Sequence, residues 1–153
     1  MLRIGAVGCG PIGLIHQKAF QSHEHSRLLG VCDVVFDKAR ERGELLGVPA
    51  YPSLSAMLES QDVDAVSVVT TDTHHFEPCL QAIRAGKHVL VEKPLTIELA
   101  EAEHLVAEAK KRSVMLAVNH NRRFGFAYRT GRRWLDEGRI GRLGYVVLRQ
   151  AQG

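Results

Sequence analysis

Short apolar runs alternate along this chain with stretches in which apolar residues recur at helical spacing. The run Leu2 to Val7 has the length of a β-strand. The turn Gly8 to Gly13 follows it, and Ile12, Ile15 and Ala19 are then apolar at the spacing of a helix. The chain therefore opens with a strand, a glycine-rich turn and a helix.

The same alternation continues to the end of the chain. Further strands are predicted at 27–32, 48–51, 64–70, 88–91, 114–118 and 145–150, and further helices at 36–46, 53–58, 75–85, 97–111 and 124–137. In the helix 97–111 the residues expected to face inward are Leu99, Ala102, Val106 and Ala109. Strands and helices that alternate through short loops predict parallel strands joined by right-handed crossovers. We therefore expect an α/β fold, a doubly wound parallel sheet of Rossmann type with helices on both faces.

The turn Gly8-Cys9-Gly10-Pro11-Ile12-Gly13 has the spacing that binds the diphosphate of a dinucleotide. Gly8 would make the tight turn, Gly10 would leave no Cβ between backbone and phosphates, and Gly13 would let the helix pack closely on the strand. Pro11 suits the first turn of a helix, where its missing N–H breaks no bond. The free N–H groups of the helix start would then face the phosphates. Glycine turns also occur without a ligand, so the surrounding sequence has to decide.

Asp33 supplies that context, because it ends the second apolar run and lies 20 residues after Gly13. A carboxylate at this place accepts hydrogen bonds from the adenosine ribose hydroxyls and would repel a 2′-phosphate. The alternative is an ordinary turn residue at a strand end. The combination with the glycines favours NAD over NADP as the cofactor. Lys38 and Arg40 follow closely, so NADP stays open as a second cofactor.

Bulk composition excludes several classes of protein. The chain has 153 residues, of which 45% are hydrophobic, so a single core is expected. A net charge of +3 does not indicate a nucleic-acid binder, and the arginine side of the helix 124–137 is interpreted as a solvated face or a surface for another domain. No apolar run reaches the roughly 18 residues that span a membrane. We expect neither nucleic acid nor membrane as a partner.

The cysteines and histidines favour a reduced, metal-free protein. Cys9, Cys32 and Cys79 have no paired spacing, which predicts free thiols in a cytoplasmic protein. The first strand begins at the N-terminus and leaves no room for a signal peptide. The pairs His23/His25 and His74/His75 lack the accompanying cysteines or carboxylates of a metal site, so no metal is expected.

Polar residues and glycines follow the predicted strands at one edge of the sheet. The strand ends are followed by 8–13, Asp33, 70–72, 92–94 and 119–121. In an open parallel sheet, ligands bind beyond the carboxyl ends of the strands. Lys93 precedes Pro94, and a residue before proline is pushed toward extended geometry, which would aim Lys93 into the crevice. The alternative is a surface lysine in a loop.

These motifs resemble the GFO/IDH/MocA family, the relatives of glucose-fructose oxidoreductase and inositol dehydrogenase. The resemblance covers essentially the whole chain and rests on the glycine turn, Asp33, Ala85-Gly86-Lys87-His88-Val89, Glu92-Lys93-Pro94-Leu95, Arg122-Arg123-Phe124 and Gly138-Arg139-Ile140-Gly141. It implies NAD(P)-dependent oxidation or reduction of a hydroxyl or carbonyl on a sugar, inositol or related polyol.

The resemblance also assigns roles to residues. The implied cofactor-binding residues are Gly8, Gly10, Pro11, Ile12, Gly13, Asp33, Thr70, Thr71, Asp72, His75, Glu92, Lys93 and Asn121. Lys93 is the implied catalytic residue, which would hydrogen-bond the reacting oxygen or join a proton relay. A cationic donor there would stabilise alkoxide character as hydride leaves carbon.

The chain departs from the family pattern in two respects. Where the family often has T-P-N-x-x-H, Thr71 replaces proline and Asp72 replaces asparagine, while Thr70 and His75 match. A carboxylate cannot donate the amide hydrogen bond. The family's acid/base histidine and its accompanying aspartate come from a second α/β domain that is missing here. We therefore expect cofactor binding with little or no turnover.

Domain boundaries follow from the same resemblance. Residues 1–123 are expected to form the NAD(P)-binding domain, and residues 124–153 a connecting helix and the first strand of a truncated C-terminal domain. That strand would be a template for pairing with a second copy. Two other functions stay open, a non-catalytic NAD-binding sensor or subunit and a binder of another adenine nucleotide.

Overall fold

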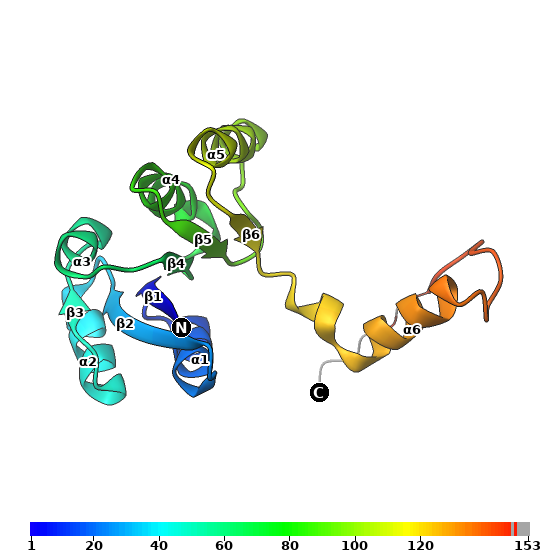
Figure 1. Cartoon of the computed structure of the whole chain (residues 1–153), viewed down its shortest axis with the longest axis horizontal. Helices are drawn as coiled ribbons and strands as arrows, with labels where there is room; N and C mark the ends of the chain where they lie inside the picture. Colours follow the sequence, from blue (N-terminus) through cyan, green and yellow to red (C-terminus); the bar gives the residue numbers. More distant parts are fainter. Residues whose placement is uncertain (148, 150–153) are drawn as a thin grey trace. The chain divides into compact units, whose positions relative to one another are not determined.

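The computed structural model describes residues 1–147 and 149 of the chain (Figure 1). These residues belong to two compact units, Met1–Asn119 and His120–Gly153. The predicted domain boundary lay four residues further on, after residue 123. Each unit is described here by itself.

The first unit is built on one parallel sheet. Its strands are β1 Leu2–Val7, β2 Ser26–Cys32, β3 Ala50–Tyr51, β4 Ala65–Val68, β5 His88–Val91 and β6 Leu116–Val118. They are ordered β3-β2-β1-β4-β5-β6, and every neighbouring pair is parallel (Figure 1). Strands β2 and β3 are added on one side of β1, and β4, β5 and β6 are added on the other side. The strand order therefore reverses between β1 and β4, which is where doubly wound sheets bind their ligands. The predicted fold class is confirmed.

Helices cover both faces of the sheet (Figure 1). They are α1 Pro11–Ser22, α2 Phe36–Leu46, α3 Leu54–Ser60, α4 Phe76–Arg84 and α5 Leu99–Arg112, with a 3₁₀ turn η1 at Asp72–His74. The smaller core cluster lies under α1 and α2 and includes Val31 and Ala39. The larger cluster lies under α3, α4 and α5 and includes Met57, Ile83 and Leu105.

Local signals set several helix ends where the sequence predicts them. The Ser53 hydroxyl accepts a hydrogen bond from the N–H of Ala56 at 3.2 Å and so caps α3. Gly47 ends α2 in the left-handed conformation with φ 65°, which a residue without Cβ adopts at little cost. Strand β4 is buried along its whole length, as expected for a strand covered on both faces.

The inward face of α5 is different from the predicted one. Leu105 and Ala109 are buried, whereas Leu99 is 74% exposed and Val106 is 42% exposed. The buried stripe runs through Leu105 and Ala109 at a spacing of four residues, and Leu99 and Val106 lie beside it on the helix surface. The apolar residues of α5 form a band wider than the sheet contact, so spacing alone could not select its centre.

Helix α1 also turns a different side to the sheet. Ile12 is 50% exposed and Ile15 is 63% exposed, although their spacing predicted the helix. The buried residues of α1 are Gly13, His16 and Gln17. A polar side chain can be buried where its hydrogen bonds are satisfied, and both His16 and Gln17 have partners inside the molecule.

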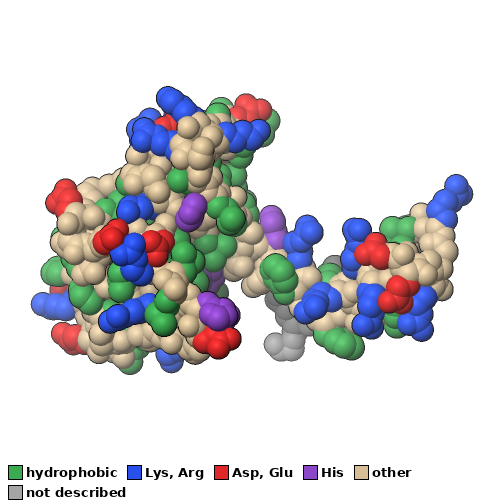
Figure 2. Space-filling view, viewed as in Figure 1, with side chains coloured by type: hydrophobic (Ala, Val, Ile, Leu, Met, Phe, Trp, Pro, Cys, Tyr) green, Lys and Arg blue, Asp and Glu red, His purple; other side chains and the backbone are tan. Residues whose placement is uncertain are grey.

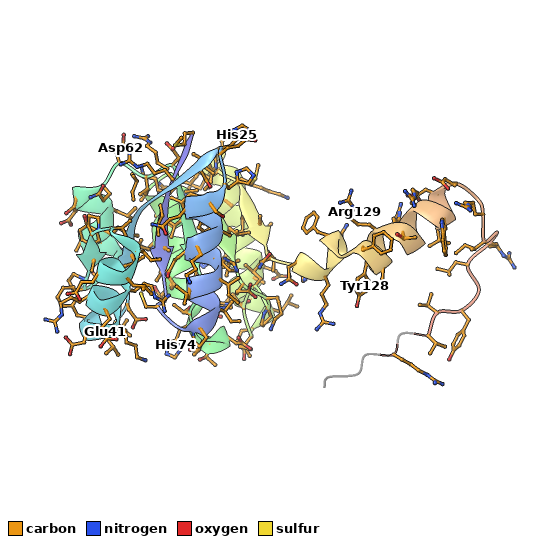
Figure 3. All side chains as sticks on the ribbon, turned by 90° about the horizontal axis from the view of Figure 1, so that it is seen from below. His25, Glu41, Asp62, His74, Tyr128 and Arg129 are labelled. Atoms are coloured by element: carbon orange, nitrogen blue, oxygen red, sulfur yellow. The ribbon has the colours of Figure 1, made fainter. Side chains whose placement is uncertain are left out.

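The second unit contains a 3₁₀ turn η2, Asn121–Phe124, and helix α6, Phe126–Asp136. None of the residues of α6 is buried, and Figure 3 shows Tyr128 and Arg129 projecting to different sides of it. The residues 145–147 have no regular structure, so the predicted strand at 145–150 is wrong for them. The described part of this unit offers no strand to pair with them. Residues 148 and 150 lie outside the described residues.

Across the described residues, no helix combines the length and the apolar character needed to cross a bilayer.

Charged side chains are intermixed over the visible face of the first unit (Figure 2). One cluster lies at the amino end of the sheet, where Arg3 donates to Asp62 and to Asp64 at 2.6 Å each and Lys87 lies 3.8 Å from Asp62. Figure 3 shows Asp62 and His74 at opposite ends of the strands. These ion pairs join β1 to the segment before β4, at the end of the sheet opposite the glycine turn.

We expect Arg3→Met to destabilise the chain at neutral pH and to make its stability less sensitive to acid. Hydrogen bonds from the Arg3 guanidinium and backbone N–H hold the pKa of Asp64 well below its usual range. A carboxyl whose pKa is lowered by folding stabilises the fold above its unfolded pKa of about 3.9, and this contribution is lost as pH falls through the folded pKa. Without Arg3 the contribution at neutral pH is smaller, so less stability is lost on acidification.

Urea unfolding midpoints between about pH 5 and about pH 2 measure the effect, and the midpoint should fall less steeply in Arg3→Met than in the parent chain. Arg27→Met is the matched control, since Arg27 pairs with Arg3 across β1 and β2 and forms no ion pair in the described part of the chain. An equal acid dependence in Arg3→Met and the parent chain would contradict this prediction.

Candidate functional site

The carboxyl ends of four strands meet at one edge of the sheet. Backbone hydrogen bonds continue past the strand ends, from Gly8 N to Cys32 O at 2.9 Å, from Val69 N to Val7 O at 2.8 Å and from Glu92 N to Val68 O at 3.0 Å. The segments that follow β1, β2, β4 and β5 are therefore neighbours. This edge holds most of the candidate residues that the sequence indicates.

The three glycines of the first turn have different steric surroundings. Gly8 has φ +100°, and a Cβ there would lie 2.3 Å from the Val69 oxygen. A Cβ on Gly13 would lie 2.2 Å from the Gly8 oxygen, whereas a Cβ on Gly10 would have no neighbour within 4 Å. Gly8 and Gly13 are thus required by the close packing of the turn itself. At Gly10 no contact with the described residues demands a glycine, because a Cβ there would face open space.

The Asp33 carboxylate is fixed against this turn. One oxygen accepts a hydrogen bond from the Cys9 N–H at 2.8 Å, and the other accepts one from the Val35 N–H at 2.9 Å. Each carboxylate oxygen has a second lone pair. The arrangement brings the predicted ribose acid into direct contact with the predicted diphosphate turn and leaves it capacity to accept further hydrogen bonds.

Lys38 and Arg40, the two cations that leave NADP possible as a cofactor, differ in their surroundings. Arg40 donates to the Asp37 carboxylate at 2.9 Å on the surface of α2. The side chain of Lys38 makes no hydrogen bond or ion pair with the described residues. The guanidinium nearest in sequence to Asp33 is therefore already paired with a carboxylate.

The segment after β4 is held together by its own side chains. The Thr70 hydroxyl donates to the His74 carbonyl oxygen at 2.9 Å, and the Thr71 hydroxyl lies 2.9 Å from the His74 ring nitrogen Nδ1. Asp72 begins η1 and is exposed. Thr71 and Asp72, which depart from the family pattern, thus stand at the surface of the edge.

His75 is fully buried, and its ring joins two of the edge segments. Nδ1 lies 2.7 Å from the Pro94 carbonyl oxygen and Nε2 lies 3.3 Å from the Thr70 carbonyl oxygen. The contact made by His75 in this structure is therefore between the segments that follow β4 and β5. A direct contact of His75 with the cofactor stays a prediction.

Glu92, a predicted site residue, is the centre of a polar cluster in which the sequence did not indicate His16 and Ser67. The Asn119 amide donates to its Oε1 at 2.6 Å, and the His16 Nε2 lies 3.0 Å from the same oxygen. The other ring nitrogen of His16 lies 3.2 Å from the hydroxyl of Ser67, a residue that is 1% exposed. Because a carboxylate only accepts, the ring nitrogen Nε2 is the donor in the contact with Glu92. Helix α1 is thereby tied to the ends of β4, β5 and β6.

These contacts keep Glu92 ionised. Burial alone would raise the pKa of Glu92, but the hydrogen bonds from Asn119, from the Lys93 N–H and from His16 outweigh it, so the pKa is lowered. The Lys93 N–H donates to Glu92 Oε2 at 3.1 Å. The carboxylate is a fixed negative charge beside the backbone of Lys93.

Lys93 itself is exposed, and its ammonium makes no ion pair with the described residues. Its neighbours on both sides are anchored, Glu92 through His16 and Asn119 and Pro94 through His75. A flexible lysine side chain thus starts from a backbone position that is held from two sides.

Asn121 lies in the second unit, where it begins η2. Its assignment to the cofactor site stays a prediction.

The thiol in the glycine turn is not a nucleophile. Burial raises the pKa of Cys9 to about 11, and the charge of Asp33 adds to the rise. Burial likewise raises the pKa values of Cys32 and Cys79 to about 12. All three thiols are free, buried and protonated at neutral pH.

Sequence reasoning missed four residues of this edge, His16, Gln17, Arg42 and Ser67. His16 and Gln17 follow Gly13 at i+3 and i+4, so their place on its side of the helix was readable once Gly13 was assigned to the sheet contact. Arg42 carried no signal, because arginine in the middle of a helix is usually solvated.

Comparison with known proteins agrees with this architecture. The model of the GFO/IDH/MocA family, described as an oxidoreductase family with an NAD-binding Rossmann fold, matches residues 2–120. The chain is 36% identical over 142 residues to a myo-inositol 2-dehydrogenase from Thermotoga maritima, covering 92% of this chain and 42% of the relative. It is 38% identical over 122 residues to a UDP-N-acetylglucosamine 3-dehydrogenase from Acidithiobacillus ferrooxidans, covering 80% of this chain and 38% of the relative.

A similar structure has been solved with ligands. The WlbA dehydrogenase from Bordetella pertussis, crystallised in complex with NADH and UDP-GlcNAcA, superposes with a TM-score of 0.87 at 28% identity, covering 92% of this chain and 41% of that one. The chain thus spans about two fifths of the length of the relatives that it matches.

The two glycines Gly10 and Gly13 predict opposite effects of the same substitution. Gly13→Ala should lower the free energy of unfolding by about 1–3 kcal/mol, because its Cβ would collide with a backbone oxygen that cannot move freely. Gly10→Ala should change it by less than about 0.5 kcal/mol but weaken NADH binding about tenfold or more, because the methyl group would enter the open space predicted for the diphosphate.

Urea unfolding and NADH titration of both variants measure the two effects. Unweakened NADH binding by a folded Gly10→Ala chain would show that the diphosphate does not lie over Gly10.

Proposed function

The chain belongs to the GFO/IDH/MocA oxidoreductase family, and from this premise we propose that it is the nucleotide-binding part of an NAD(P)-dependent dehydrogenase. The diphosphate would lie over the turn Gly8–Gly13, and the adenosine ribose would bind Asp33. One observation carries the proposal, the hydrogen bond from the Cys9 N–H to the Asp33 carboxylate, which brings the residue proposed for the ribose against the turn proposed for the diphosphate. The same carboxylate favours NAD over NADP, since it would repel a 2′-phosphate.

The cofactor, when bound, accepts or returns a hydride at its nicotinamide ring. The residues that remain to be assigned are those that manage the substrate's proton. We propose Lys93 for contact with the reacting oxygen, because it is the exposed cation at the end of β5 and its backbone is held from both sides. An ammonium donor near a developing alkoxide lowers the energy of the transition state.

The substrate class follows from the relatives. Their names specify inositol and nucleotide-linked amino sugars, so we propose a sugar, inositol or related polyol for this chain too. The alternative of a non-catalytic NAD sensor is less favoured, because a sensor has no need of an anchored lysine at this edge. A cytoplasmic location and association between copies of the chain stay proposals.

Titration of the purified chain with NADH and NADPH tests the cofactor assignment. We expect NADH to bind at least about tenfold more tightly than NADPH, because burying a phosphate beside a carboxylate is unfavourable. Asp33→Asn, which keeps the size of the side chain, should weaken NADH binding and narrow the difference. Tighter binding of NADPH by the parent chain would overturn the assignment.

The 153-residue chain should show no measurable oxidation of myo-inositol with NAD⁺, although it binds NADH. Of the described residues at the edge, Lys93 is the one proposed for the reacting oxygen, and the family's acid/base histidine has no counterpart in the sequence. Appearance of NADH absorbance, with a heat-treated sample as the control, measures turnover. Clear turnover by the chain alone would show that its own residues complete the active site.

A further inference from the structure

Three consecutive carbonyl groups of the glycine turn are held from the helix side. The Gln17 amide donates to the Gly8 oxygen at 3.2 Å, and Arg42 donates to the Cys9 oxygen at 2.9 Å and to the Gly10 oxygen at 3.4 Å. The Gly10 oxygen also accepts from the Leu14 N–H at 3.2 Å, whereas the Gly8 and Cys9 carbonyls are left over where the chain turns from a strand into a helix. Here two side chains from different helices satisfy them.

Arg42 and Gln17 also bind each other. Arg42 donates to the Gln17 Oε1 at 2.5 Å, which fixes the amide with its oxygen toward the guanidinium and its nitrogen toward the turn. Gln17 is fully buried on α1, and Arg42 is partly buried on α2. We refer to these two residues as the clamp.

The clamp determines where the N–H groups of the turn point. A peptide unit is planar and trans, so its N–H points away from its carbonyl. With the Cys9 carbonyl held toward the helices, the Gly10 N–H points to the opposite, open side. Within the part of the chain that the structure describes, the N–H groups of Gly10, Ile12 and Gly13 donate to no acceptor. An anion bound over the turn would find these donors already aligned.

Arg42 also brings a charge that the chain does not neutralise. Its neighbour Arg40 is paired with Asp37, whereas Arg42 has no carboxylate partner among the described residues. The effect of this charge on the turn is seen in the pKa of Cys9. Burial and the charge of Asp33 raise that pKa, and the charge of Arg42 lowers it. A partly buried, unpaired cation beside free N–H groups favours an anionic ligand.

We propose that Arg42 is a positioning residue for the diphosphate, which presets the turn through the clamp and contributes its charge to binding. This inference rests on the proposed function, because it takes the diphosphate of NAD as the anion. The competing explanation is that the clamp only staples α1 to α2. A staple would affect every ligand and the fold equally, whereas a diphosphate device affects the ligands that carry phosphates.

The experiment compares three probes, NADH, ADP and adenosine, in NMR titrations of the parent chain and of Arg42→Met, which keeps most of the apolar stem. We expect Arg42→Met to weaken the binding of NADH and of ADP about tenfold or more, and the binding of adenosine less than about twofold. Arg40→Met is the matched control, since it removes an arginine from the same helix without touching the turn, and NADH binding should not change. The Gly10 amide resonance should shift in Arg42→Met and not in the control.

The outcomes separate the explanations. Equal weakening of all three probes, or unchanged NADH and ADP binding in Arg42→Met, would overturn the inference while leaving NADH binding by the parent chain, and so the proposed function, intact. Failure of the parent chain to bind NADH would overturn both. Should Arg42→Met not fold, Arg42→Lys is the second variant, because it keeps the charge without the fork of donors. We expect it to bind ADP more weakly and adenosine as tightly as the parent chain does. An unchanged ADP affinity would contradict the proposal.

Discussion

The structure depends on how helix α1 satisfies the polar groups that it buries. Most helices that cover a sheet present apolar side chains, but α1 presents Gly13, His16 and Gln17. Burying these polar groups is tolerable only because each finds a partner, His16 at Ser67 and Glu92 and Gln17 at the Gly8 carbonyl. Those partners are the strand ends and the glycine turn. The requirement for internal hydrogen bonds therefore places α1 and organises the edge at the same time.

The same hydrogen bonds explain why the edge is rigid where a ligand would bind. Gln17 holds the glycine turn, and His16 holds Glu92 next to Lys93. His75 does the corresponding work on the other side by binding the Pro94 carbonyl. A site that is held in advance loses less conformational entropy when the ligand arrives. The half-buried Gly10 and the exposed Lys93 at this edge both have sequence neighbours that are buried or hydrogen-bonded.

The sequence predicted the order of strands and helices and the carboxyl edge, because short apolar runs and glycine turns are local signals. Asp33 was found by its distance from Gly13, and the structure places it in contact with the turn. The faces of α1 and α5 were not predicted, since Ile15 and Leu99 are apolar yet 63% and 74% exposed. The contacts of Arg42 with Cys9 and Gly10 could not be predicted either. They span sequence separations of 33 and 32 residues and depend on how α1 and α2 pack.

The two ends of the sheet use charge in different ways. At the amino end, Arg3 and Asp64 are half-buried and Asp62 is exposed, and salt partly screens their ion pairs. At the carboxyl end, Glu92 and Arg42 lie at partly buried positions, where a charge interacts more strongly with whatever faces it. Solvent-exposed pairs can be exchanged without moving the edge, whereas each buried charge is coupled to the backbone of a loop. Arg42, which has no carboxylate partner among the described residues, thus places a positive charge at the edge where an anionic cofactor would compensate it.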